Sequence, residues 1–220
     1  MNALKNSLLN SGTKIAQVGY SSTPTMKVRT TPLLTLRQIS LLGQSKEQVS
    51  PLEQIFVEIE AALRAGLYHA ALAVTLTLPD VCAALIHPKG VSPKGGYATW
   101  FDENLPEYAE ALPGEEAYKM RCGFLHQARP TRSDMIWNRV AFGIGGPAQA
   151  MMKGNSWDGV PMPDTYILDV FAFCRAVVIS ARAWLSANND NVNVRANLPH
   201  VVRRRPEGLP PLMAGLTVIA

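Results

Sequence analysis

The chain has 220 residues, of which 47% are hydrophobic and 17% are charged, enough for one ordinary domain with a buried core. Its net charge of +4 is uneven: residues 1–50 carry +5 (six basic, one acidic), residues 51–186 carry −3 (11 basic, 14 acidic) and residues 187–220 carry +2 (four basic, two acidic). The acidic centre argues against nucleic-acid binding over the whole surface of the domain.

Cysteine and histidine patterns exclude several kinds of site. The three cysteines lie far apart without a CxxC pair, so we expect free thiols in a reducing cytoplasm and not a disulfide framework or a zinc site. The four histidines are also isolated from one another. We therefore predict no metal site and no cofactor. The longest apolar stretch, Leu67–Ile86, contains Pro79 and Asp80, which predicts a core helix and no membrane span.

In the N-terminal half of the chain, we predict a leader without regular structure that ends at residue 49 and helices that begin at Ser50. Residues 1–49 are rich in Ser, Thr, Gln and Lys without a period, which predicts a poorly ordered leader. The sequence SPLE at residues 50–53 is typical of a capping box with proline at the first helical position. Apolar residues then recur at helical spacing as far as Gly66. Leu67–Ile86 is predicted as a second, almost wholly apolar helix that is kinked or split at Pro79.

The central part of the chain predicts two more helices. Residues 97–105 place their aromatic side chains on one helical face, which indicates core packing. Residues 115–128 follow Gly114, begin with two acidic residues and end just before Pro130, all of which favours a helix. Gly123 in the middle of that helix indicates that another backbone approaches closely.

The C-terminal part predicts a β-hairpin followed by a last helix. Residues 135–142 alternate with period two, Thr165–Leu168 resembles a partner strand, and Asp169 can cap the helix that follows. Residues 188–220 are predicted to be a flexible basic tail, in which Leu216–Ile219 could pair locally. The predicted fold class is therefore mainly α: a bundle of about five helices over residues 50–187, with a β-hairpin inserted before the last helix and flexible tails.

Potentially chemical side chains gather in residues 114–132, GEEAYKMRCGFLHQARPTR. Arg121 and His126 lie about 140° apart around a helix, so they can line one groove only if another element crosses it. Histidine can take or return a proton near neutral pH, and arginine offers a charged fork to phosphate. Arg129 and Arg132, just beyond the helix, could bind neighbouring phosphates of a substrate.

The Arg-x4-His spacing late in an apolar helix resembles the motif of the HEPN superfamily. The resemblance implies a helical bundle, often a homodimer, that acts as a metal-independent endoribonuclease in toxin–antitoxin or defence systems. It implies RNA as substrate, His126 as general acid/base, Arg121 as phosphate stabiliser, and an antitoxin or other protein as partner. Cys122 stands where the family often has a polar residue. The segments TLPDVCAAL, YATWFDENL and GEEAYKMRCGFLHQ are also similar to a class of uncharacterised bacterial proteins.

A second interpretation stays open beside the enzyme. The chain would then be a non-catalytic helical module that binds a protein or nucleotide partner. His126 would cap carbonyl groups at the helix end, and Arg121 would pair with an acidic residue across the bundle. The acidic candidates are Asp80, Asp102 and Glu103.

Overall fold

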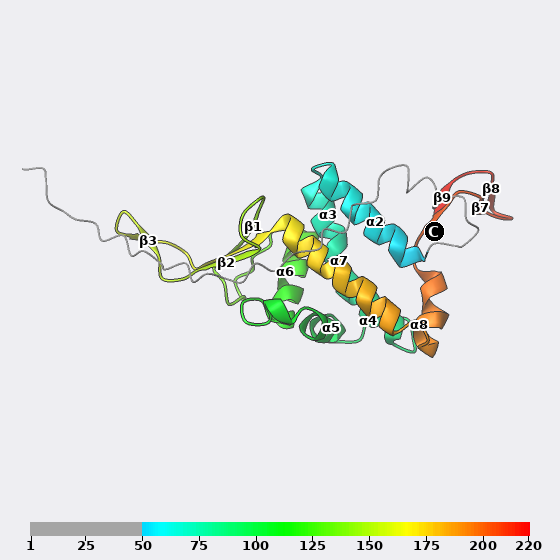
Figure 1. Cartoon of the computed structure of the whole chain (residues 1–220), viewed down its shortest axis with the longest axis horizontal. Helices are drawn as coiled ribbons and strands as arrows, with labels where there is room; N and C mark the ends of the chain where they lie inside the picture. Colours follow the sequence, from blue (N-terminus) through cyan, green and yellow to red (C-terminus); the bar gives the residue numbers. More distant parts are fainter. Residues whose placement is uncertain (1–49) are drawn as a thin grey trace, which may run out of the picture. The chain divides into compact units, whose positions relative to one another are not determined.

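The structure is a computed structural model that describes residues 50–220 (Figure 1). The predicted leader, residues 1–49, lies outside the described residues. The helices are α2 (Pro51–Arg64), α3 (Tyr68–Thr75), α4 (Leu78–Ile86), α5 (Gly96–Asn104), η1 (Pro106–Tyr108), α6 (Gly114–Gln127), α7 (Val170–Ala187), α8 (Val192–Asn197) and η2 (Leu198–His200). The strands are β1 (Arg139–Gly143), β2 (Gln149–Met152), β3 (Ser156–Trp157), β4 (Val160–Pro161), β5 (Thr165–Asp169), β6 (Arg204–Arg205), β7 (Gly208–Leu209), β8 (Met213–Ala214) and β9 (Val218–Ile219).

The first helix forms where the apolar period predicts it, but its start differs in detail. The residues Leu52, Phe56 and Ile59 of α2 are almost fully buried. The predicted capping box is wrong, because the Ser50 side chain makes no capping hydrogen bond. The carboxylate of Glu53, the other half of that box, instead accepts hydrogen bonds from Arg182 of α7 at 2.7 and 3.1 Å.

The apolar stretch after α2 forms two helices, which confirms a split and not a kink near Pro79. The helix α3 ends at Thr75 and α4 begins at Leu78, with Pro79 in its first turn. By length and composition, Tyr68–Ile86 and Val170–Ala187 could each span a membrane. Both stretches supply buried side chains to the core, among them Leu72 and Phe173. Core helices of soluble proteins have the same composition, so these two helices are weak evidence for a membrane protein.

The prediction of a mainly helical bundle with one β-hairpin is wrong, because the described chain is mixed α/β. Helices make up 49% and strands 15% of it. The main sheet has the order β1-β5-β2, in which β1 and β5 run parallel and β2 runs antiparallel to β5. The predicted hairpin partners are therefore parallel neighbours. The chain can return in this direction because residues 144–164 contain β2 and a hairpin, β3–β4, whose turn is Asp158–Gly159 with φ of 50° and 76°.

The sheet is joined to the helices through Asp169, as the capping prediction expected. Its side chain accepts the amide hydrogen of Ala172 at 2.9 Å, at the start of α7. The second carboxylate oxygen accepts the amide hydrogen of Gly145 at 2.8 Å. Since β5 leads directly into α7, the sheet lies at the N-terminal end of this helix (Figure 1).

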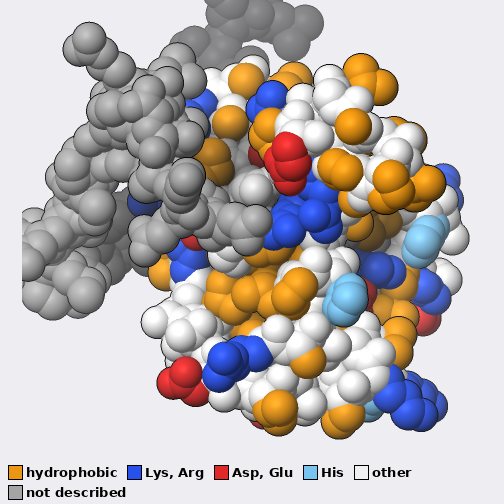
Figure 2. Space-filling view, turned by 90° about the vertical axis from the view of Figure 1, so that its right-hand side faces the viewer, with side chains coloured by type: hydrophobic (Ala, Val, Ile, Leu, Met, Phe, Trp, Pro, Cys, Tyr) orange, Lys and Arg blue, Asp and Glu red, His pale blue; other side chains and the backbone are white. Residues whose placement is uncertain are grey.

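Residues 188–220 contain regular structure, in contrast to the predicted flexible tail. Asn191 caps α8, and the amide of Asn197 donates to the carbonyl groups of Leu85 and His87 at the end of α4. These contacts hold α8 against the helical core. The expected local pairing of residues 216–219 is confirmed for β9, which pairs with β6. At this end of the molecule, basic side chains lie among exposed hydrophobic ones (Figure 2).

Candidate phosphate-binding site

Arg121 belongs to an ion pair between α6 and α4. Its Nη2 lies 2.9 Å from Oδ2 of Asp80, and Ser92 Oγ donates to Oδ1 of the same carboxylate at 3.1 Å. The Arg121 and Asp80 side chains are 21% and 24% exposed. The pairing with Asp80 is the arrangement that the non-catalytic interpretation expects for Arg121.

His126 lies on the surface, one residue before the last residue of α6. Its side chain makes no hydrogen bond to residues 50–220, so it does not cap the helix. The backbone does this instead: the amide groups of Ala128 and Arg129 donate to the carbonyl groups of Phe124 and Gly123 at 3.1 and 3.0 Å. Ala128 takes the left-handed conformation, with φ of 53°, that this helix end requires. Neither Arg121 nor His126 lines the pocket described below.

The two arginines predicted to bind substrate do lie together. Arg129 and Arg132 line an open pocket of about 720 Å³ formed by the loop after α6 and the start of β1. Arg139 of β1 completes what we call the arginine pocket. Its full lining is Arg129, Pro130, Thr131, Arg132, Ser133, Met135, Trp137, Asn138, Arg139 and Val140. No acidic side chain is part of this lining.

The loop can lie against α6 because residue 123 is glycine. A Cβ at Gly123 would overlap with the carbonyl oxygen of Arg129 and would touch Cγ of Arg132. The predicted close approach at Gly123 is thus confirmed, although the approaching backbone is the loop of the same chain and not a second helix. Gly123 therefore fixes the distance between α6 and the arginine pocket.

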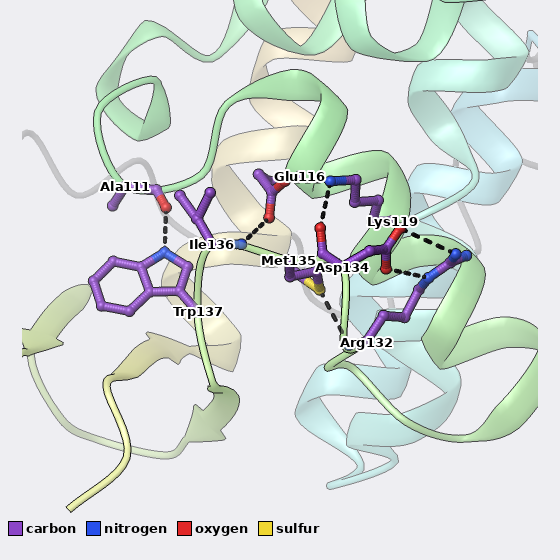
Figure 3. A network of polar contacts seen from close by, with 8 residues as sticks. All are labelled: Ala111, Glu116, Lys119, Arg132, Asp134, Met135, Ile136 and Trp137. Carbon is purple, nitrogen blue, oxygen red and sulfur yellow. Dashed lines mark hydrogen bonds and ion pairs between the residues drawn. The ribbon is translucent and has the colours of Figure 1, made fainter.

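A buried carboxylate of α6 fixes the other side of the loop (Figure 3). Glu116 is 5% exposed, and its two oxygens accept from Lys119 Nζ at 2.7 Å and from the amide of Ile136 at 2.8 Å. Lys119 Nζ also donates to the carbonyl oxygen of Asp134 at 2.7 Å. The hydrogen bond to Glu116 raises the pKa of Lys119, so the ammonium group stays charged at neutral pH.

The floor of the arginine pocket is Trp137, which is 1% exposed. Its Nε1 donates to the carbonyl oxygen of Ala111 at 2.6 Å, and its ring stacks on Tyr166 with 5.3 Å between centroids (Figure 3 shows the first contact). Lys153 Nζ lies 4.6 Å from the centroid of the Trp137 ring. The Trp137 side chain is therefore fixed by its contacts with Ala111, with Tyr166 of β5 and with Lys153.

The three arginines of the pocket differ in their partners. Arg132 forms a two-fold contact with Asp134, with distances of 3.0 and 3.3 Å, and this contact lowers the pKa of the Asp134 carboxyl. Arg129 and Arg139 are exposed and form no ion pair with another described residue. Two guanidinium groups are thus available to an anion, and the third is shared with Asp134.

Sequence reasoning missed Arg139 and Lys153 as parts of this site. The alternating pattern of residues 135–142 predicts only that Arg139 lies in a strand, because its distance from Arg129 depends on how β1 follows the loop. Within residues 50–220, no group of three His, Cys, Asp or Glu side chains is placed to hold a metal ion. The chemistry of the arginine pocket is that of an anion site.

In comparisons with models of protein families, with curated proteins and with solved structures, nothing matches this chain.

Proposed function

We propose that this protein binds RNA and holds its phosphate groups in the arginine pocket. The observation that carries the proposal is the meeting of Arg129, Arg132 and Arg139 in one open pocket without an acidic lining residue. Guanidinium groups bind phosphate oxygens through paired hydrogen bonds. The proposal corresponds to the interpretation of the chain as a non-catalytic module, with a nucleic acid as the partner that it binds.

The charge of the rest of the molecule favours local and not general phosphate binding. Residues 50–220 contain 15 basic and 16 acidic residues, a net charge of −1. Attraction to a polyanion over the whole surface is therefore weak, and affinity has to come from a few phosphates in the pocket. Two phosphates on a single strand, neutralised by Arg129 and Arg139, correspond to a slope of about −1.4 in a plot of log K against log salt concentration.

The experiment that tests this proposal is fluorescence anisotropy of a labelled single-stranded RNA with the full chain. We expect Arg129→Ala and Arg139→Ala each to weaken binding. The matched control is Arg175→Ala, because Arg175 is an exposed arginine of α7 outside the pocket. Equal loss in all three variants, or no loss in any, would contradict binding in the arginine pocket.

A second candidate is RNA cleavage of the HEPN type, by a cytoplasmic homodimer that is a toxin or defence component. The observation that favours it is His126, which is exposed, has no described partner and lies three residues before Arg129. His126 would move a proton as general acid/base, while Arg129 and Arg132 would hold the phosphate. In this candidate Arg121 would contribute through its pair with Asp80, which orients α6.

The test of the second candidate is metal-free cleavage of an RNA pool in EDTA. Activity in the wild type that falls by about 10²-fold or more in His126→Ala, with RNA binding retained, would support an acid/base role. RNA binding without any cleavage would leave the first proposal alone.

A further inference from the structure

The C-terminal segment forms a hairpin with an uncharged outer part. Strand β6 pairs with β9 and β7 pairs with β8, both antiparallel, so residues 203–220 run out to a tip at residues 210–212 and return. Figure 1 shows β7 and β8 farther from the helices than β9. Residues 208–220, GLPPLMAGLTVIA, contain no charged side chain. We call residues 203–220 the C-terminal hairpin.

Hydrophobic side chains of this hairpin are exposed to an unusual extent. Leu212 at the tip is 81% exposed, and Ile219 on β9 is 78% exposed. Between them in the sequence, Met213 is 50% and Leu216 is 65% exposed. Single exposed hydrophobic side chains are common on protein surfaces, whereas a group of them on one small element indicates a protein or membrane interaction site.

Three arginines lie at the base of the hairpin, where β6 begins. Arg204 is exposed, and Arg203 and Arg205 are half-buried. Arg205 Nε donates to the Ala220 oxygen at 3.1 Å. None of the three forms an ion pair with a described side chain. Their charges are therefore available to an anionic partner.

Positive charge and apolar surface meet on one face of the hairpin. Arg204 and Ile219 are cross-strand partners, so their side chains point to the same side of the β6–β9 pair. Figure 2 shows basic side chains among exposed hydrophobic ones at this end of the molecule. Glu207 is the only acidic residue of the hairpin, which therefore carries a net charge of +2 (three basic, one acidic).

The candidate partners of this surface differ in charge. Residues 1–49 carry +5 (six basic, one acidic), and a second copy of the hairpin carries +2, so like charges disfavour both on the arginines. A bilayer with anionic lipids offers negative headgroups to the arginines and an apolar interior to the leucine and methionine side chains. A projecting tip enters a fluid bilayer without the matching pocket that a protein partner has to supply.

We propose that the C-terminal hairpin binds the surface of a bilayer that contains anionic lipids. Leu212 and Met213 enter the headgroup region, and Arg204 contacts lipid phosphates. The protein then lies on the membrane without spanning it. This surface shares no residue with the arginine pocket, so the proposal goes beyond RNA binding and does not depend on it.

The test is co-sedimentation of the full chain with two kinds of vesicle, phosphatidylcholine alone and an equal mixture of phosphatidylcholine and phosphatidylglycerol. We expect binding to the mixed vesicles, weakened by added salt, and no binding to phosphatidylcholine alone. Leu212→Ser should weaken binding by about tenfold, because it removes the most exposed apolar side chain of the tip. Arg204→Ala should weaken it by about fivefold.

Each variant has a matched control outside the hairpin. Leu67→Ser changes a leucine that is 59% exposed just before α3, and Arg175→Ala removes an exposed arginine of α7. Both controls should bind the mixed vesicles as the wild type does. Thermal melts should be the same for Leu212→Ser, Arg204→Ala and the wild type, since both side chains are exposed.

Three results would overturn the proposal. The first is no binding of the wild type to the mixed vesicles at low salt. The second is equal binding by Leu212→Ser, Arg204→Ala and the wild type, which would assign vesicle binding to the basic residues 1–49. The third is a lower mass of Leu212→Ser than of the wild type in analytical ultracentrifugation without vesicles, which would assign the tip to contact between two copies of the chain.

Discussion

The middle of α6 and the segment that follows its C-terminal end use arginine in opposite ways. Arg121, in the middle of the helix, gives its guanidinium to Asp80 and ties α6 to α4. Arg129 and Arg139, beyond the helix end, have no acidic partner among the described residues and line an open pocket. The partner of an arginine, more than its place in a motif, therefore decides whether its charge stabilises the fold or is available to a ligand.

The largest effect that separates these regions is expected from Gly123→Ala. The new Cβ overlaps with the carbonyl of Arg129, so the loop must leave α6. We expect a loss of roughly 2–4 kcal/mol in the free energy of unfolding, measured in urea, together with loss of RNA binding. Gly146→Ala is the control, because a Cβ there meets nothing within 4 Å. A Gly123→Ala variant of normal stability would show that the loop does not pack on α6.

The second effect concerns the ion pair itself. Arg121→Ala leaves Asp80 without its partner, and we expect a loss of about 1–2 kcal/mol, because the pair is partly exposed. The double variant with Asp80→Asn should be less than additive. RNA affinity should not change, since neither residue lines the arginine pocket. A stable Arg121→Ala variant that loses RNA binding would reverse the assignment of roles.

The third effect belongs to the pocket. Arg139→Ala should weaken RNA binding by about 3- to 10-fold and should change the free energy of unfolding by no more than about 0.5 kcal/mol. The slope of log K against log salt should fall in magnitude by about 0.7, the contribution of one phosphate contact. Anisotropy titrations at several salt concentrations measure both quantities. An unchanged slope would mean that Arg139 contacts no phosphate.

Local patterns predicted the helices well, because a buried helix repeats its apolar residues along a continuous stretch. The helical spacing of Leu52, Phe56 and Ile59 predicts α2, and Pro79 indicates the break between α3 and α4. The sheet was not predictable in the same way. The strand β2 has the sequence QAMM, which does not alternate, and the parallel pairing of β1 with β5 depends on a connection of about twenty residues.

The candidate site was predictable only in part, for a related reason. Arg129 and Arg132 were found because they follow α6 directly in the sequence. The partner of Arg121 was one of three acidic candidates, and only the packing of both α4 and α6 against α5 selects Asp80, 41 positions earlier in the chain. The pocket also needs Arg139, whose position follows from the contact of Trp137 with Ala111. Contacts between distant segments leave no local period in the sequence.

The smallest effect tests the turn that directs the chain from α6 into the pocket. Ala128 takes φ of 53°, which costs an alanine more than a glycine. We therefore expect Ala128→Gly to stabilise the protein by about 0.5–1 kcal/mol in urea unfolding. Ala61→Gly, at an exposed position of α2, should destabilise it by a similar amount, since glycine disfavours an ordinary helical conformation. If the two substitutions change the free energy of unfolding in opposite directions, the left-handed turn at Ala128 is present in solution. If both substitutions destabilise the protein, Ala128 lies in ordinary helix, and Arg129 then lies further from Arg139.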